Sequence, residues 1–239
     1  MKPRVVIYTL GFSPHKQVSL IPSAAACQSI NEGMKIWGRP WRIKIDNGLP
    51  FVNPKNIDLP TLSQLWWIGL GIEVQLNALG VPQQNGTVEG LQGVCRRWSN
   101  PAGYDNIADY QERVDQTNRI QREVYRLRKQ GDKTRKELYP QLWQNPRTYN
   151  PDEFWIDKVY KDLATRVWKR RIKDKGDLKF WKKEIYIGTR FKNQKVTITF
   201  DPDELQWMVR SNDGRLLKVC SKERFTEAQI LEHAGISKN

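Results

Sequence analysis

The first third of the chain alternates apolar runs typical of strands with amphipathic stretches typical of helices. Two β-branched runs flank Ser-Pro-His-Lys, which favours a hairpin, and glycines, prolines and Asp-Asn-Gly separate the later segments. The predicted strands are residues 4–12, 17–21, 41–45 and 72–76. The predicted helices are 24–37, capped by Ser23, and 59–71, with Pro60 in its first turn. The pattern indicates an α/β domain, and Trp66 and Trp67 are expected in core or inter-domain packing.

A polar stretch and a second helical pattern follow. Residues 81–91 read V-P-Q-Q-N-G-T-V-E-G-L, and Pro82 and Gly86 favour a mobile loop that ends in a helix near Thr87. Residues 105–130 have apolar positions at helical spacing and nearly balanced charge, which predicts a solvated helix. The turn-rich sequence of residues 145–151 predicts a domain boundary.

The last third reads as a small antiparallel β-barrel, because short apolar strands recur with turn signals between them. The predicted strands are 179–181, 184–189, 195–200, 205–210 and 215–219. Thr226 is expected to cap a terminal helix. The predicted division is a core at 1–100, a helical connector at 101–150, the barrel at 151–225 and a helical tail at 226–239.

The charge of the chain points to a polyanionic partner. The 239 residues contain 40 Lys and Arg against 26 Asp and Glu, a net charge of +14. Residues 161–199 alone contain 13 basic and four acidic side chains. No apolar run reaches the roughly 20 residues of a membrane span, and no secretory signal pattern is present. We therefore expect a cytoplasmic protein with no membrane contact, and the three scattered cysteines show no zinc pattern.

Two carboxylates stand where predicted elements begin or end. Asp46 ends the strand 41–45, and Glu89 opens the helix after the polar loop. Carboxylates at such ends can meet at one sheet edge and hold hard divalent cations. The residues alone also allow roles other than metal binding. Asp46 could simply form a turn, and Glu89 could be a favourable negative charge at the start of a helix.

The amino-acid sequences around Asp46 and Glu89 resemble motifs of a known superfamily. D-N-G-L-P-F (46–51) and P-Q-Q-N-G-T-V-E (82–89) resemble the second and third acidic blocks of DDE transposases and retroviral-type integrases, over about residues 4–98. Residues 166–219 resemble the Mu-type barrel that follows this core in many bacterial transposases. The resemblance implies an RNase H-like core, then a helical connector and a barrel.

The resemblance also implies roles for individual residues. Asp46 and Glu89 match the second and third metal ligands, and the loop with Gln84, Asn85 and Gly86 matches the segment beside the scissile DNA. The implied reaction is attack of water or a 3′-hydroxyl on a DNA phosphodiester, activated by two Mg²⁺ or Mn²⁺ ions. The implied partners are transposon ends and target DNA, bound by a homo-oligomer; in a prokaryote the protein would be nucleoid-associated.

The family's first carboxylate has no counterpart here. Glu32 is the only acidic residue before Asp46, and it lies in a predicted helix next to Gly33, not on a strand. We therefore expect an incomplete core, from a truncated or decayed transposase. A catalytically silent, basic DNA-binding protein derived from a transposase is the alternative, and the enzymatic status of the chain stays open.

Basic side chains complete the predicted DNA contacts. Arg96 shares a helix face with Glu89 and Gln92, so it could reach a phosphate near the metal site. A dense basic cluster is expected to contact the DNA backbone, and its members are Arg166, Lys169, Arg170, Arg171, Lys173 and Lys175. Neither prediction excludes a role without DNA. Arg96 could be an ordinary solvated arginine, and the cluster could lie on a strand edge that is merely solvated.

Overall fold

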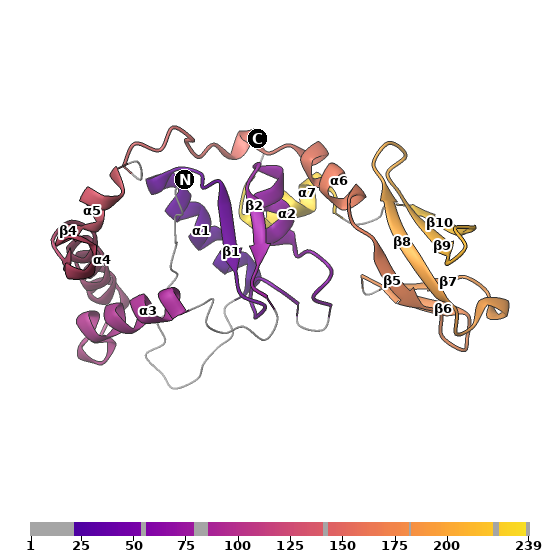
Figure 1. The fold of residues 1–239 in the computed structure, drawn as a ribbon, viewed down its shortest axis with the longest axis horizontal. Coiled ribbons are helices and arrows are strands. Elements are labelled where there is room, and N and C mark those ends of the chain that lie inside the picture. Colours follow the sequence, from indigo (N-terminus) through magenta and orange to yellow (C-terminus); the bar gives the residue numbers. More distant parts are fainter. Residues whose placement is uncertain are drawn as a thin grey trace. The chain divides into compact units, whose positions relative to one another are not determined.

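The computed structural model describes residues 22–53, 56–78, 86–140, 143–181, 183–221 and 225–237 (Figure 1). The hairpin predicted at 4–12 and 17–21 lies outside these residues, as do Gln84 and Asn85. The chain divides into two compact units, Met1–Val52 with Ile72–Asn150 and Asn53–Gly71 with Pro151–Asn239. These units do not coincide with the four segments predicted from the sequence, because residues 53–71 group with the C-terminal half.

The first unit contains a helix and a two-stranded parallel sheet. Helix α1 (Ser23–Trp37) precedes strand β1 (Arg42–Ile45), which pairs in parallel with β2 (Glu73–Leu76). The prediction that Ser23 caps α1 is wrong: Ser23 is its first residue, and Pro22 occupies the cap position without a side-chain hydrogen bond. The helix ends at Gly38 as predicted, with φ +74°, a conformation that glycine adopts without steric cost.

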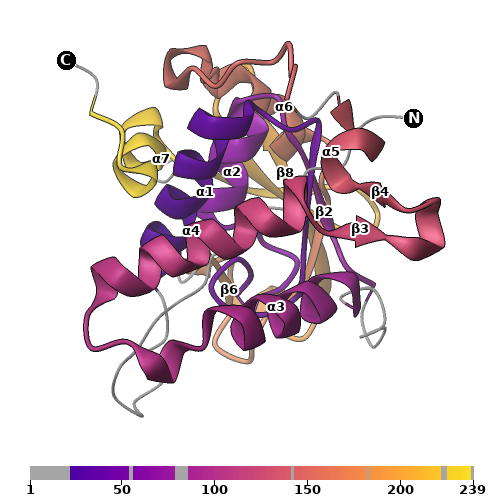
Figure 2. The same ribbon diagram turned by 90° about the vertical axis from the view of Figure 1, so that its left-hand side faces the viewer.

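The rest of the first unit is mainly helical (Figure 2). Its elements are α3 (Gly86–Ser99), η2 (Pro101–Gly103), α4 (Ile107–Glu123), β3 (Arg126–Leu127), η3 (Arg128–Gln130), β4 (Lys133–Thr134) and α5 (Arg135–Leu138). The predicted helix over 105–130 is correct only to Glu123. Val124 and Tyr125 are exposed at 64% and 45%, so the apolar helical stripe does not continue, and a short hairpin turns at Gly131.

The second unit has a helical part built around α2 (Leu62–Gly69). Thr61 caps α2 by accepting a hydrogen bond from Gln64 N, so the prediction of Pro60 inside the first turn is wrong. The predicted burial of Trp66 and Trp67 is confirmed, since both are fully buried. This helical part also contains η5 (Pro151–Glu153), α6 (Ile156–Ala164) and α7 (Glu227–Ala234). Both α6 and α7 pack on α2, and Thr226 caps α7 as predicted.

Five of the six strands of the second unit lie near predicted positions, whereas the first of them, at residues 168–171, is not among the predicted strands. They are β5 (Trp168–Arg171), β6 (Asp177–Phe180), β7 (Lys183–Tyr186), β8 (Lys195–Asp201), β9 (Gln206–Ser211) and β10 (Leu216–Ser221), with η6 (Thr189–Phe191) after β7. An antiparallel sheet has the order β10-β9-β8-β5, and β6-β7 is a separate hairpin.

The predicted closed barrel is wrong for the described residues, in which no sheet closes on itself. The hairpin β6–β7 pairs with no other strand among the described residues. Gly176, at the base of this hairpin, has φ +81°, and an added Cβ would lie 2.5 Å from the backbone of Gly188. The hairpin packs on the sheet through aromatic rings, with Phe180 5.7 Å from Trp168 and 5.2 Å from Trp207.

The described residues thus form a mixed α/β structure with seven α-helices and several small sheets. None of the described helices has the length and apolar character needed to cross a membrane.

Candidate functional site

Asp46 lies at the carboxyl edge of the parallel β1–β2 pair. It follows Ile45 directly, is exposed, and its Oδ1 accepts a hydrogen bond of 3.3 Å from Gly48 N. The next residue, Asn47, donates from Nδ2 to the carbonyl of Asn77 at 2.9 Å, which joins the ends of the two strands. The Asp-Asn-Gly turn therefore presents the carboxylate to solvent at a sheet edge, and this geometry suits both the turn interpretation and the metal-ligand interpretation.

Glu89 is the fourth residue of α3, and its side chain lies outside the described part of the structure. The expected proximity of the Asp46 and Glu89 carboxylates therefore stays a prediction. The sequence places Gly86 in the loop, but it is the first residue of α3. Among the described residues, no neighbouring atom lies within 4 Å of a Cβ added to Gly86.

Arg96 is exposed in the last turn of α3, next to Arg97. Cations at this end of a helix interact favourably with the helix dipole. This location accounts for Arg96 without DNA, so its predicted phosphate contact stays a prediction.

The oxygen donors at Asp46 can be compared with those that a hard cation needs. Among the described residues there is no group of three or more His, Cys, Asp or Glu side chains that could hold a metal ion. The edge at Asp46 offers one described carboxylate with the Asn47 amide beside it. Mg²⁺ usually keeps several waters and binds one or two carboxylates, so this donor chemistry fits such an ion.

Three members of the basic cluster have carboxylate partners. Arg166 Nε lies 2.8 Å from Asp162 Oδ2, and Lys173 Nζ lies 3.1 Å from Asp177 and 3.2 Å from Glu184. These last two carboxylates raise the pKa of Lys173 through hydrogen bonds. A phosphate would have to compete with these partners, so these side chains are poorer DNA contacts than their sequence position suggests.

Arg170 is the third paired member, and it holds residue 58 against β5. Its two terminal nitrogens bond the two Asp58 oxygens at 2.7 and 3.2 Å, and its guanidinium lies 5.6 Å from the centre of the Phe180 ring. Trp168 Nε1 also donates to the Asp58 carbonyl at 2.9 Å. The side chain of Arg170 is only 19% exposed, so its contacts are those of a structural residue.

Lys169 and Arg171 point the other way from Trp168 and Arg170, because successive strand residues alternate between faces. Both are exposed on the edge strand β5. Lys175, in the turn before β6, is exposed as well. The cluster therefore divides between paired or core-facing side chains and solvent-facing ones.

Strand register adds two residues that the sequence analysis missed. Arg171 pairs with Lys195 of β8, and Lys169 pairs with Thr197, which pairs in turn with Arg210 of β9. We call this set the basic face: Lys169, Arg171, Lys195 and Arg210. None of the four has a carboxylate partner among the described residues. Alternation within K-V-T-I-T-F (195–200) signals that Lys195 faces solvent, but its neighbours depend on the pairing.

The basic face has little competing negative charge. Along β8 the residues on this side are Lys195, Thr197 and Thr199, and Asp201 follows only at the end of the strand. Directly opposed like charges destabilise a sheet, so the Arg171–Lys195 pair is unfavourable without an anion. An extended polyanion such as the DNA backbone would relieve this repulsion.

Comparisons with known proteins give no identification: no protein-family model matches the chain, and a search of curated proteins found no significant match.

Proposed function

We propose that this chain is a DNA-binding protein of the recombination class, similar to DDE transposases, and that the basic face contacts the backbone of double-stranded DNA. The observation that carries the DNA contact is the register of Arg171 opposite Lys195, two exposed cations without an ion-pair partner among the described residues. The chain's net charge of +14 agrees with a polyanionic partner. Contacts to phosphates carry no sequence information, so binding by this face is sequence-independent.

Salt-dependent binding to duplex DNA tests this interaction. The double variant Arg171→Gln/Lys195→Gln should bind unrelated duplexes more weakly, and the slope of log affinity against log salt should become shallower by about 0.9 for each phosphate that is no longer neutralised. Lys158→Gln/Lys161→Gln is the matched control, because it removes two exposed charges from α6. Equal weakening in both doubles would mean that only net charge matters, and would contradict a specific face.

The recombination part of the proposal rests on the two motif blocks and their surroundings. Asp46 stands at the carboxyl edge of a parallel strand pair, and Glu89 stands in the first turns of α3. We propose that α1, β1, β2 and α3 belong to an RNase H-like core, and that Asp46 and Glu89 bind Mg²⁺ or Mn²⁺. A bound ion would supply charge compensation at a DNA phosphate. A homo-oligomer on DNA is part of the same proposal.

A catalytically silent DNA-binding protein is the second candidate function. The observation that favours it concerns Glu32, the only acidic residue before Asp46. Glu32 is exposed on α1 and bonds Lys35 at 2.7 Å, so it has the environment of a solvated helix residue. Phosphoryl transfer depends on charge compensation, so a site with two carboxylates is expected to bind an ion weakly and to react poorly.

Mn²⁺ binding and DNA cleavage separate the two candidates. Asp46→Asn and Glu89→Gln should each weaken Mn²⁺ binding, measured by calorimetry or spin resonance, whereas Glu32→Gln should not. Cleavage of plasmid DNA that disappears in Glu89→Gln would favour the enzyme. Mn²⁺ binding without cleavage would favour the silent protein. If Mn²⁺ binding is unchanged in both Asp46→Asn and Glu89→Gln, the metal proposal fails, although DNA binding could remain.

A further inference from the structure

A groove opens in the second unit between the hairpin β6–β7 and strand β10. Its volume is about 450 Å³. The floor consists of four aromatic side chains, Phe180, Trp181, Trp207 and Phe225. The two walls are Lys183–Tyr186 of β7 and Lys218–Ser221 of β10. We call this feature the seam groove, because it lies where a closed barrel would join its last strands.

The walls of the seam groove are strand edges. Four consecutive residues line each wall, whereas a wall formed by one face of a strand would contain alternate residues. Among the described residues β7 pairs only with β6, and β10 pairs only with β9. The backbone groups of Glu184–Tyr186 that point away from β6, and those of β10 that point away from β9, lie outside these ladders and are the ones that a ligand could bond.

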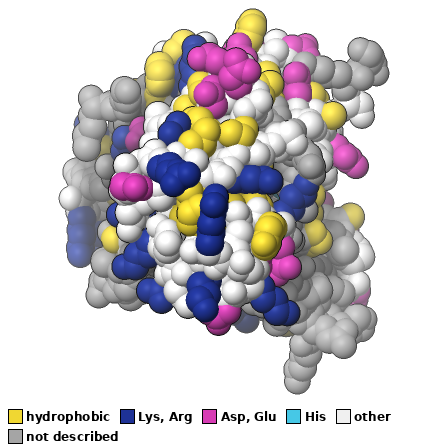
Figure 3. All heavy atoms as spheres, turned by 90° about the vertical axis from the view of Figure 1, so that its right-hand side faces the viewer, with side chains coloured by type: hydrophobic (Ala, Val, Ile, Leu, Met, Phe, Trp, Pro, Cys, Tyr) yellow, Lys and Arg dark blue, Asp and Glu magenta, His cyan; other side chains and the backbone are white. Residues whose placement is uncertain are grey.

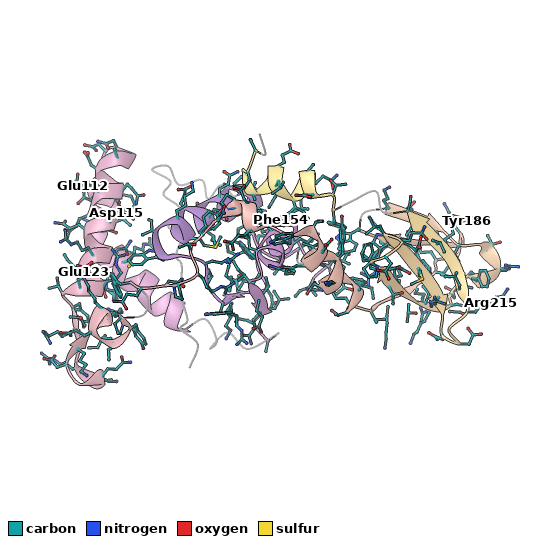
Figure 4. All side chains as sticks on the ribbon, turned by 90° about the horizontal axis from the view of Figure 1, so that it is seen from above. Glu112, Asp115, Glu123, Phe154, Tyr186 and Arg215 are labelled. Carbon is teal, nitrogen blue, oxygen red and sulfur yellow. The ribbon has the colours of Figure 1, made fainter. Side chains whose placement is uncertain are left out.

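The floor is preorganised by ring packing. Trp181 lies 4.3 Å from Phe225 and 5.0 Å from Trp207, measured between ring centres. Its φ is +47°, an uncommon conformation for a bulky residue. At the mouth, Tyr186 is 61% exposed, and Figure 4 shows it at the end of the β-rich part. The groove thus offers one exposed ring and one half-buried ring for stacking.

The charge around the groove is positive. Lys183 and Lys218 stand on opposite walls, and the one carboxylate among the described lining residues, Glu184, bonds Lys173 at 3.2 Å. Burial raises the pKa of the Cys220 thiol, and the positive charges of Lys218 and Lys183 oppose this shift. Both lysines are therefore close enough to Cys220 to interact with it electrostatically. Figure 3 shows Lys and Arg side chains around hydrophobic ones on this end of the unit.

We propose that the seam groove binds a short segment of single-stranded nucleic acid. Bases stack on Tyr186 and Trp181, the strand edges bond base polar groups, and Lys218 approaches a phosphate. Aromatic platforms inside a basic groove are the usual means of binding single strands without sequence preference. The free strand edges would also suit an extended peptide, but the lysines and the exposed ring favour a polyanion with π-faces. The proposal does not depend on the basic face or on the metal site.

Fluorescence anisotropy with a labelled oligothymidine of about 12 nucleotides tests the proposal. Tyr186→Ala should weaken binding about fivefold to a hundredfold, the effect expected for one stacked base, while Tyr186→Phe should retain it. Lys218→Gln should reduce the salt slope by about 0.7. Tyr139→Ala, which removes another exposed tyrosine in the first unit, is the control and should have no effect. Thermal unfolding of each variant checks that the fold is intact.

The same variants separate this site from the basic face. Tyr186→Ala should leave affinity for a blunt duplex unchanged, whereas Arg171→Gln/Lys195→Gln should weaken duplex binding. If Tyr186→Ala leaves oligothymidine binding unchanged, or weakens the duplex equally, the proposal is wrong. A peptide of alternating valine and glutamate serves as competitor. Should it bind with a dependence on Tyr186 while oligothymidine does not, the groove is a peptide site and the proposal is overturned.

Discussion

Arg171 and Lys195 lie directly opposite one another in the antiparallel β5–β8 ladder, two cations in register on an exposed sheet face. Neither has a carboxylate partner among the described residues. Repulsion between the two cations therefore destabilises the folded protein locally, and a bound anion could remove this repulsion.

The first prediction concerns stability without DNA. Arg171→Gln should raise the free energy of unfolding by about 0.2–1 kcal/mol, because it removes like-charge repulsion across the strands. Urea denaturation at low salt measures the gain, and high salt should reduce it. A decrease in stability would mean that Arg171 makes favourable contacts that its register does not reveal.

The second prediction contrasts Arg170 with its neighbour. Arg170→Gln should lower the free energy of unfolding by about 1–2 kcal/mol, because it breaks the two-bond contact with Asp58 and the contact with the Phe180 ring. The slope of log affinity for duplex DNA against log salt should be nearly the same for this variant as for the unmodified protein. If the variant is as stable as the unmodified protein but its DNA affinity depends less on salt, Arg170 belongs to the DNA contact.

The third prediction concerns Gly38 at the end of α1. An added Cβ would lie 2.6 Å from the Arg147 carbonyl and from the Asn145 amide, at φ +74°. Gly131 has φ +73° but no atom within 4 Å of an added Cβ. Gly131→Ala should therefore cost about 1 kcal/mol from backbone strain, and Gly38→Ala clearly more, about 2–4 kcal/mol. Equal destabilisation in chemical denaturation would argue against close packing at Gly38.

The fourth prediction concerns the contact between α7 and α2. His233 Nε2 lies 2.9 Å from Ser63 Oγ, and burial lowers the pKa of His233 below its ordinary 6.5. The unfolded chain then binds a proton at a higher pH than the folded protein. The stabilisation from neutral His233 is complete above about pH 6.5, and it disappears as pH falls below that value.

His233→Gln isolates this effect. The difference in free energy of unfolding between the two proteins should shrink between about pH 7.5 and 5.5, because only the unmodified protein has this histidine. Identical pH dependence in both would assign the titration to other groups.

Local signals predict those elements whose ends are marked by particular residues. Gly38 ends α1, Thr226 caps α7, and the alternating residues of β8 and β9 correspond to buried and exposed positions. Ser23 and Pro60 mislead the prediction, because each suits several neighbouring positions at a helix start. The helix over 105–130 is predicted too long, since its apolar spacing continues past the point where Val124 leaves the packed face.

Relationships between distant segments are beyond the sequence. The cluster from Arg166 to Lys175 reads as one charged patch, yet Arg170 bonds Asp58, a residue 112 positions away, while Arg171 faces solvent. Lys195 and Arg210 join the basic face only through strand register. The separation of the β6–β7 hairpin from the four-stranded sheet is likewise a matter of strand pairing, which no local pattern specifies. The expected meeting of Asp46 and Glu89 at one site stays a prediction.

The position of α2 has a consequence for synthesis on the ribosome. α2 packs on α6 and α7, and Trp66 stacks on Phe154 with ring centres 5.1 Å apart. Translation supplies α2 long before these partners, since the whole of residues 72–150 is made in between. The apolar face of α2 therefore stays exposed in the nascent chain until α6 and α7 have been made, and this unit can complete its folding only after α7 has emerged. A gene fragment that begins at Pro151 would encode the sheet without the helix on which α6 and α7 pack.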